Sequence, residues 1–198
     1  ANLYRIKNHL GLLNALEQLP PRAMLVVVGH PTHETDYVEE VRRALSTRPD
    51  VLYIPGLHRD GVAAAFQAAN LVVLSSDAEV SPLCLLEAMS LRRPWLATPS
   101  CGTANEQAGG LILPLQEFRG AIDVLMAHPD YCAQLAQSGY DHWAKCFQWE
   151  SILAGWVELI RNGRLTTSFD TPDAMARTRD DLRARFRSLM HNGTTPMP

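Results

Sequence analysis

The sequence predicts an α/β fold with a doubly wound parallel sheet, followed by a helical tail at the carboxyl end. Two observations support this prediction. Five short apolar runs recur along the chain without alternating polar residues, which is typical of strands covered on both faces. Stretches with helical spacing of apolar residues separate most of these runs, and strands that alternate with helices favour parallel pairing with right-handed crossovers. The runs are Met24–Val28, Val51–Ile54, Leu71–Leu74, Trp95–Thr98 and Leu111–Leu113.

The first four helices are predicted from spacing and from their end signals. Apolar residues three or four positions apart define each of them. The second is expected to begin at Asp36, where Glu39 completes a capping box. The fourth is expected to have Ser81 as its N-cap and Pro82 at its first helical position. The four helices are expected over about 6–16, 36–45, 60–69 and 81–89.

Helices are also predicted after the fifth run, over 115–127, 129–147 and 149–161. The last of them has a strongly amphipathic face, formed by Trp149, Ile152, Leu153, Trp156 and Ile160, which we expect to be buried together with Trp143. From Asn162 the chain becomes polar and basic, with six Arg and four Asp up to its end, and a charged helix is expected over about 173–190. Its narrow apolar stripe fits the body of the domain, a missing domain or a partner, and a solvated tail fits equally. We therefore expect one domain over 1–161 and a linker with a tail over 162–198.

Composition excludes several classes of protein. The net charge of −3 lacks the basic footprint of a duplex-binding protein, so no nucleic-acid partner is expected. No apolar run reaches the roughly 18–20 residues of a membrane span, and no signal peptide is recognisable, so a cytoplasmic location is expected. The four cysteines have no C-x-x-C spacing and are expected to be free thiols. His30 and His33 lack a third ligand at useful spacing, so no metal site is expected.

The stretch from Ser75 to Thr98 carries the clearest chemical signal. Glu79 lies before the start of the predicted helix and Glu87 lies inside it, at the carboxyl end of a predicted central strand. The free amides of a helix start attract anions, and flanking carboxylates accept hydrogen bonds from sugar and ribose hydroxyls. Two Glu eight residues apart also occur by chance, and a Glu at a helix start is ordinary dipole compensation.

This stretch resembles the donor-binding signature of retaining glycosyltransferases with the GT-B fold, in particular family 4. The similarity covers residues 1 to about 161 as an ordered set of short matches. Those in the stretch itself are Ser75-Ser76, Glu79, Leu83, Leu85-Leu86, Glu87-Ala88-Met89 and Arg93-Pro94-Trp95. The others are Asn2 to Asn8, Val28-Gly29, Ile54 to Leu57, Gly102 to Glu106, Gly109-Gly110 and Phe147 to Trp149.

The resemblance implies a Rossmann-like donor domain, the C-terminal half of a GT-B fold, and assigns roles to individual residues. It implies that Lys7 neutralises the leaving diphosphate and that Glu79 contacts sugar hydroxyls near the reacting carbon. It also implies that Glu87 binds the ribose and that the loop at Gly56 and Leu57 meets the base. Neither a cofactor nor a metal is implied, because the nucleotide sugar is a co-substrate.

The sequence departs from the family pattern at two places. The family's Gly-Phe-Gly is a Val-Ser-Pro tripeptide here, so Pro82 cannot donate a backbone hydrogen bond to a phosphate. Ser81 offers its hydroxyl instead, and Leu83 matches the family pattern again. The Arg that the family places before its Lys is Asn2 in this chain, which leaves Arg5 or an upstream residue to supply the second positive charge.

The leading hypothesis is a retaining hexosyltransferase of which this chain is the donor-binding domain, inactive without an amino-terminal acceptor domain. Its expected partners are a nucleotide sugar and that missing domain, and an acceptor at a membrane surface is compatible with it. The alternative is a non-catalytic nucleotide-sugar-binding or scaffolding module of the same fold. A redox enzyme ranks third, because no G-x-G-x-x-G follows the first predicted strand.

Overall fold

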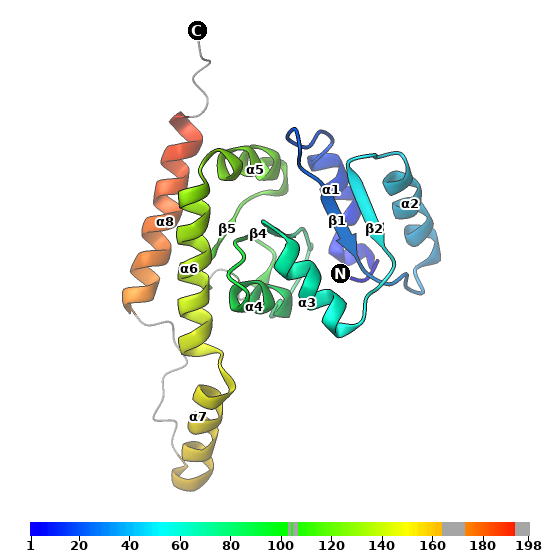
Figure 1. Ribbon diagram of the computed structural model, residues 1–198. Helices are drawn as coiled ribbons and strands as arrows, with labels where there is room; N and C mark the ends of the chain where they lie inside the picture. Colours follow the sequence, from blue (N-terminus) through cyan, green and yellow to red (C-terminus); the bar gives the residue numbers. More distant parts are fainter. Residues whose placement is uncertain (103, 105–106, 164–172, 193–198) are drawn as a thin grey trace.

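The computed structural model describes residues 1–102, 104, 107–163 and 173–192. Its strands coincide with the five predicted apolar runs, and every strand pair is parallel. Helices lie between successive strands as predicted, except between the last two, so the α/β fold class is confirmed (Figure 1). The strands are β1 (Leu25–Val28), β2 (Val51–Ile54), β3 (Val72–Leu74), β4 (Trp95–Ala97) and β5 (Gly110–Ile112).

The described strands form two ladders instead of one continuous sheet. One has the order β1-β2 and the other the order β3-β4-β5, and Figure 1 shows β1 and β2 set apart from β4 and β5. The amino-terminal segment connects their carboxyl ends. Leu3 N–H donates to the carbonyl of His30 after β1 (2.9 Å), and Asp77 N–H after β3 donates to the carbonyl of Ile6 (2.8 Å). The start of the chain therefore lies where loops from both ladders meet.

All eight predicted helices are present, but two predicted helix starts are wrong. Helix α2 has Glu34 as its N-cap without a side-chain hydrogen bond, so Asp36 and Glu39 form no capping box. Helix α4 begins after Pro82, whose ψ of 96° is extended, so neither Ser81 nor Pro82 has its predicted position. The helices are α1 (His9–Ala15), α2 (Thr35–Ser46), α3 (Arg59–Ala68), α4 (Leu83–Ser90), α5 (Phe118–Ala127), α6 (Pro129–Cys146), α7 (Trp149–Asn162) and α8 (Asp173–Asn192). None of these helices, within the described residues, is long and apolar enough to cross a membrane.

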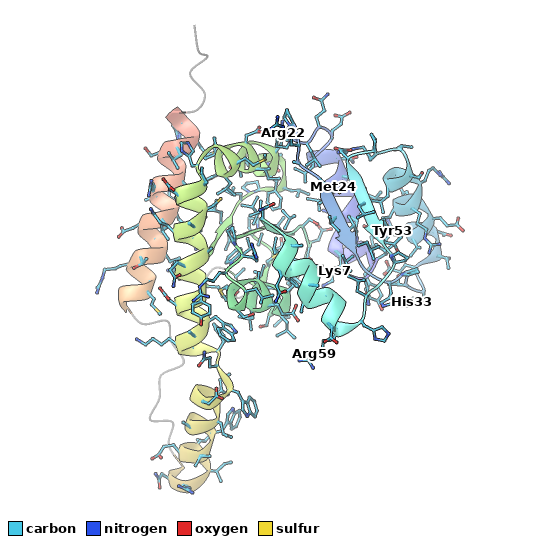
Figure 2. All side chains as sticks on the ribbon, viewed as in Figure 1. Lys7, Arg22, Met24, His33, Tyr53 and Arg59 are labelled. Carbon is cyan, nitrogen blue, oxygen red and sulfur yellow. The ribbon has the colours of Figure 1, made fainter. Side chains whose placement is uncertain are left out.

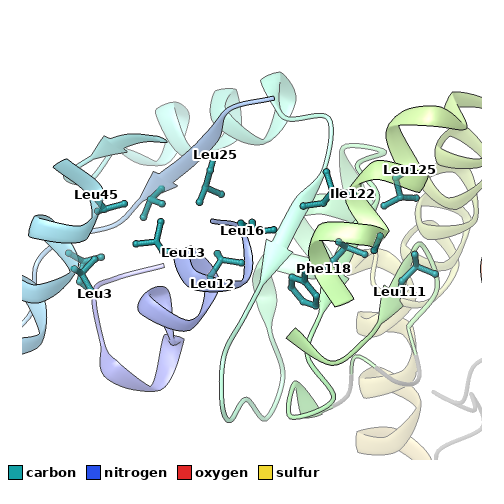
Figure 3. Packing of buried hydrophobic residues seen from close by; sticks show 14 of the residues in the cluster. Leu3, Leu12, Leu13, Leu16, Leu25, Leu45, Leu111, Phe118, Ile122 and Leu125 are labelled. Atoms are coloured by element: carbon teal, nitrogen blue, oxygen red, sulfur yellow. The ribbon is translucent and has the colours of Figure 1, made fainter. Parts of the chain in front are cut away.

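One hydrophobic cluster connects the two ladders. It contains Leu25 of β1, Leu16 after α1, Leu111 of β5 and Phe118 of α5, and Figure 3 shows the first two on one side of the cluster and the last two on the other. Because α1 supplies leucines between the ladders, burial of apolar surface stabilises their association.

Helix α8 packs on the body of the domain, which decides among the alternatives that the sequence left open. Phe186 is 2% exposed and belongs to the main hydrophobic cluster. Its ring stacks on Tyr131 of α6 with 6.2 Å between the ring centroids. The hydroxyl of Tyr131 donates to the carbonyl of Leu182 (2.8 Å), so α8 is attached by both packing and a hydrogen bond.

The prediction that the apolar face of α7 is buried is wrong. Trp149, Trp156 and Ile160 are 68%, 54% and 79% exposed, and Leu153 is exposed as well. Figure 1 shows α7 projecting beyond the end of α6, away from both ladders. Helical spacing predicts that such a face exists, whereas its burial depends on an opposing surface, which the described residues do not supply. Trp143, which was predicted to be buried together with this face, does pack against a buried cluster.

A buried histidine makes the stability of the domain depend on pH. His142 of α6 is 2% exposed, and its Nδ1 accepts a hydrogen bond from the backbone N–H of Ala108 (2.9 Å). Burial, with a smaller contribution from the positive charge of Arg179, lowers the pKa of His142 from 6.5 to about 4. The folded state therefore keeps this imidazole neutral at a pH at which the unfolded chain already binds a proton.

We expect His142 to destabilise the domain as the pH falls from 6.5 to 4. Above the pKa of the unfolded chain, protonation of His142 costs no stability. Below the pKa of the folded state, about 3 kcal/mol of unfolding free energy has been lost. In thermal or urea unfolding across this range, His142→Asn keeps an acceptor and should lose clearly less stability than the wild type. His58→Asn, at an exposed position, is the control. Parallel pH profiles for wild type and His142→Asn would contradict this assignment.

Candidate functional site

A hollow of about 360 Å³ lies between the amino-terminal segment and the start of α4, beside the last residue of β3. Four of the eight predicted site residues line it: Lys7, Glu79, Ser81 and Leu83. Loops at the carboxyl ends of parallel strands are where ligands bind in such folds. The remaining lining residues are Ala1, Asn2, Tyr4, Leu74, Pro82 and Cys84.

Lys7 and Glu79 form an ion pair in this hollow. The Lys7 ammonium contacts Oε1 of Glu79, and the two side chains are 24% and 16% exposed. The Ser75 hydroxyl donates to the Lys7 carbonyl (2.9 Å), which fixes the backbone that carries the ammonium. Figure 2 shows Lys7 between the β1–β2 ladder and helix α3. A cation and a carboxylate 72 residues apart in sequence thus share one partly enclosed site.

Glu79 makes two hydrogen bonds in addition to the ion pair with Lys7. Its N–H donates to the carbonyl of Ser100 (3.0 Å), and the Ser76 hydroxyl donates to its Oε1 (3.0 Å). Ser76 is fully buried and is fixed in turn by the Thr98 hydroxyl, which donates to its carbonyl (2.6 Å). Sequence reasoning did not assign Ser76 a role, although a serine three residues before the carboxylate and directly behind a strand was the available signal.

The first residues of α4, which line the same hollow, have backbone N–H groups without helix partners. The first hydrogen bond of this turn is from Leu85 N–H to the Pro82 carbonyl (3.0 Å), so the amides of Leu83 and Cys84 precede the bonded part of the helix. Such amides and the helix dipole favour an anion. Burial, reinforced by the carboxylates of Glu79 and Glu87, raises the pKa of the Cys84 thiol to about 11. This thiol is therefore neutral at neutral pH.

The other four predicted residues lie outside the lining of the hollow. Arg5 has its guanidinium over the Tyr37 ring, 4.8 Å from the centroid. Gly56 has a φ of +90°, and a Cβ there would overlap the His30 ring, so this loop requires glycine. Leu57 lies against Gly61 at the start of α3, and Glu87 is exposed on α4. Their roles remain predictions, and the predicted loop residues 103, 105 and 106 lie outside the described residues.

The described part of the chain holds no group of three or more His, Cys, Asp or Glu side chains suited to a metal ion. His30 packs under Gly56, and the ring of His33 meets Tyr4 edge-on with 5.7 Å between centroids. Lys7 and Glu79 are the charged side chains among the residues that line the hollow.

Comparison with known proteins connects this geometry to a family. The family model described as glycosyl transferases group 1 matches residues 1–128, which include Lys7, Glu79 and Glu87. The chain belongs to the group 1 glycosyltransferases. Among curated proteins, D-inositol 3-phosphate glycosyltransferase of Rhodococcus erythropolis is 27% identical over 147 residues, which are 69% of this chain and 33% of that protein.

Several solved structures share the fold. HepE of Anabaena in complex with UDP superposes with a TM-score of 0.74 at 22% identity, covering 81% of this chain and 46% of HepE. Sucrose-phosphate synthase of Thermosynechococcus elongatus gives 0.71 at 24% identity, covering 81% and 43%. The C-terminal domain of LpcC, a group 1 protein of Francisella tularensis, gives 0.59 at 20% identity, covering 71% and 79%. The chain thus spans a third of the curated relative and less than half of the first two structures.

Proposed function

We propose that this chain is the donor-binding, C-terminal half of a retaining glycosyltransferase that transfers a hexose from a nucleoside-diphosphate sugar to an acceptor. The acceptor would be held by an amino-terminal half that the chain lacks, and without it the chain would not transfer sugar. The likeness to an isolated C-terminal domain of LpcC supports this division. We also propose a cytoplasmic location, which the four free thiols support.

The observation that carries the proposal is the pairing of Lys7 with Glu79 beside the start of α4. A departing diphosphate needs a nearby cation and fixed hydrogen-bond donors, and such preorganised charge is a large contribution to catalysis. Lys7 supplies the cation, and the amides of Leu83 and Cys84 supply donors. Glu79, released from Lys7 by the diphosphate, would accept hydrogen bonds from the sugar. Complexes of HepE with UDP and with UDP-glucose make a uridine donor the first to test.

The second candidate is a non-catalytic module of the same fold that binds nucleotide sugars or acts as a scaffold. The residue that favours it is Pro82, which occupies the N-cap of α4 and has no N–H to offer a phosphate. Measurements on the whole protein separate the two candidates, because a scaffold would bind UDP-glucose without cleaving its glycosidic bond.

We expect the 198-residue chain to bind UDP and UDP-glucose in calorimetry and to show no transfer by itself, because the proposed acceptor half lies outside these 198 residues. Glu79→Gln should keep UDP binding and weaken UDP-glucose binding by about tenfold, the size of one charge-assisted hydrogen bond. Glu150→Gln, on the exposed part of α7, is the control. Efficient transfer by the chain alone would contradict the two-domain proposal, and failure to bind any nucleoside diphosphate would contradict the donor site.

A further inference from the structure

The carboxyl-terminal helix α8 reaches the loop between β4 and β5 through one arginine. Arg183 is half-buried, and its guanidinium donates to the carbonyls of Gln107 (3.1 Å) and Gly110 (3.3 Å). The carbonyl of Ala104 lies 3.5 Å from the same group. The family model matches residues 1–128. Arg183 lies on a helix outside this range, and its carbonyl partners lie in a loop inside it.

The end of this loop is buried and rigidly held. Gln107, Ala108 and Gly109 are buried, and the indole N–H of Trp95 donates to the Ala108 carbonyl (3.2 Å) while His142 accepts from the Ala108 N–H (2.9 Å). Arg183 adds a cationic donor at this loop end, and burial lowers its pKa from the usual value. Cationic donors form stronger hydrogen bonds to carbonyls than neutral ones.

From its buried end the loop returns to Glu79 through described backbone contacts. Gln107 N–H donates to the Ala104 carbonyl (3.2 Å), and Ala104 N–H donates to the Cys101 carbonyl (3.0 Å). Immediately before Cys101, the carbonyl of Ser100 accepts the N–H of Glu79 (3.0 Å). At Gly102 a Cβ would overlap the carbonyl of Glu79, so this loop lies directly against the backbone of the carboxylate.

We propose that Arg183 is a positioning residue for the donor site, which fixes the β4–β5 loop and thereby the backbone of Glu79. This inference rests on the proposed donor role of Glu79. Helix α8 would then influence the orientation of the sugar through this loop, although no residue of α8 lines the hollow. Loss of the guanidinium would loosen the loop end, widen the range of Glu79 positions and weaken binding of the sugar more than binding of the diphosphate.

The test compares Arg183→Met with Arg187→Met, an exposed arginine one turn further along the same helix. Calorimetry well below the melting temperature should show UDP-glucose affinity reduced by about tenfold in Arg183→Met, in the range of mutations that act through coupled contacts. UDP affinity should change by less than threefold, and Arg187→Met should match the wild type. Arg183→Lys, which keeps the charge and fewer donors, should fall in between and serves if Arg183→Met does not fold.

Hydrogen exchange supplies a readout that does not need a ligand. Amides of residues 76–80 and 98–102 should exchange faster in Arg183→Met than in Arg187→Met. Unchanged exchange there, or a lower melting temperature with unchanged UDP-glucose affinity, would show that Arg183 only stabilises the fold and would overturn the inference. If the wild type binds neither UDP nor UDP-glucose, the proposed function fails, whereas the exchange comparison still decides whether Arg183 positions Glu79.

Discussion

Lys7→Ala is expected to lower turnover of the whole protein by at least ~100-fold, the cost of removing one donor that stabilises developing charge. In the present chain the same change should lower affinity for UDP by tenfold or more and leave affinity for uridine unchanged, because uridine has no phosphate. The chain has one other lysine, Lys145, which is exposed on α6 and far along the sequence from the hollow. Lys145→Ala is therefore a matched control and should behave like the wild type.

The ion pair changes what Lys7→Ala does to stability. Loss of a fully exposed lysine would cost little stability, but Lys7 is only 24% exposed and neutralises a carboxylate that is 16% exposed. Removing it leaves Glu79 without this partner, so unfolding measurements should show a loss. The double variant Lys7→Met with Glu79→Gln should recover stability without recovering UDP affinity. Equal UDP affinity in wild type and Lys7→Ala would refute the role assigned to this lysine.

Trp95→Ala is expected to cost about 3–5 kcal/mol of unfolding free energy, a large share of the stability of an ordinary domain. Trp95 is fully buried, its indole lies where a Cβ on Gly110 would be, and its N–H donates to the Ala108 carbonyl. The substitution therefore leaves a cavity under β5 and an unsatisfied carbonyl.

Trp156→Ala is the matched control for this change. Trp156 is 54% exposed on α7, so its removal should alter the denaturation midpoint far less than removal of Trp95. Urea unfolding followed by circular dichroism suits both variants. Similar losses in the two would mean that the packing around β4 is not what stabilises the domain.

Local sequence patterns sufficed for the elements of the fold. Unbroken apolar runs predicted all five strands within one or two residues, because burial on both faces leaves no room for alternation. Patterns of spacing could not say what covers a face. The apolar stripe of α8 is packed against Tyr131, whereas the stronger stripe of α7 is exposed. Amphipathicity is a property of one helix, and burial is a property of two surfaces.

The site was less accessible to local patterns. Glu79 could be singled out from its place before a helix, but nothing near Lys7 indicates that it meets a carboxylate 72 residues away, and only the family resemblance related the two. Arg183 was missed for the same reason, because the carbonyls that it meets within 3.3 Å belong to a loop more than 70 residues away in sequence. Ser76 is different: it donates to a carboxylate only three residues away, so a local signal existed and was not used.

The division of the strands into two ladders has a consequence for cooperativity. Within the described residues no ladder hydrogen bond joins β1 to β3. The two halves are coupled by leucine packing, by the contacts of residues 1–8 and by the hydrogen bond from Arg119 to the Gln18 carbonyl. Side-chain packing of this kind yields in partial openings that cost less than global unfolding. Since Lys7 lies in the connecting segment and Glu79 beside the β3–β5 half, each such opening would separate the pair. The lifetime of the Lys7–Glu79 pair is then limited by how often the contacts between the two halves open, not by the stability of either half.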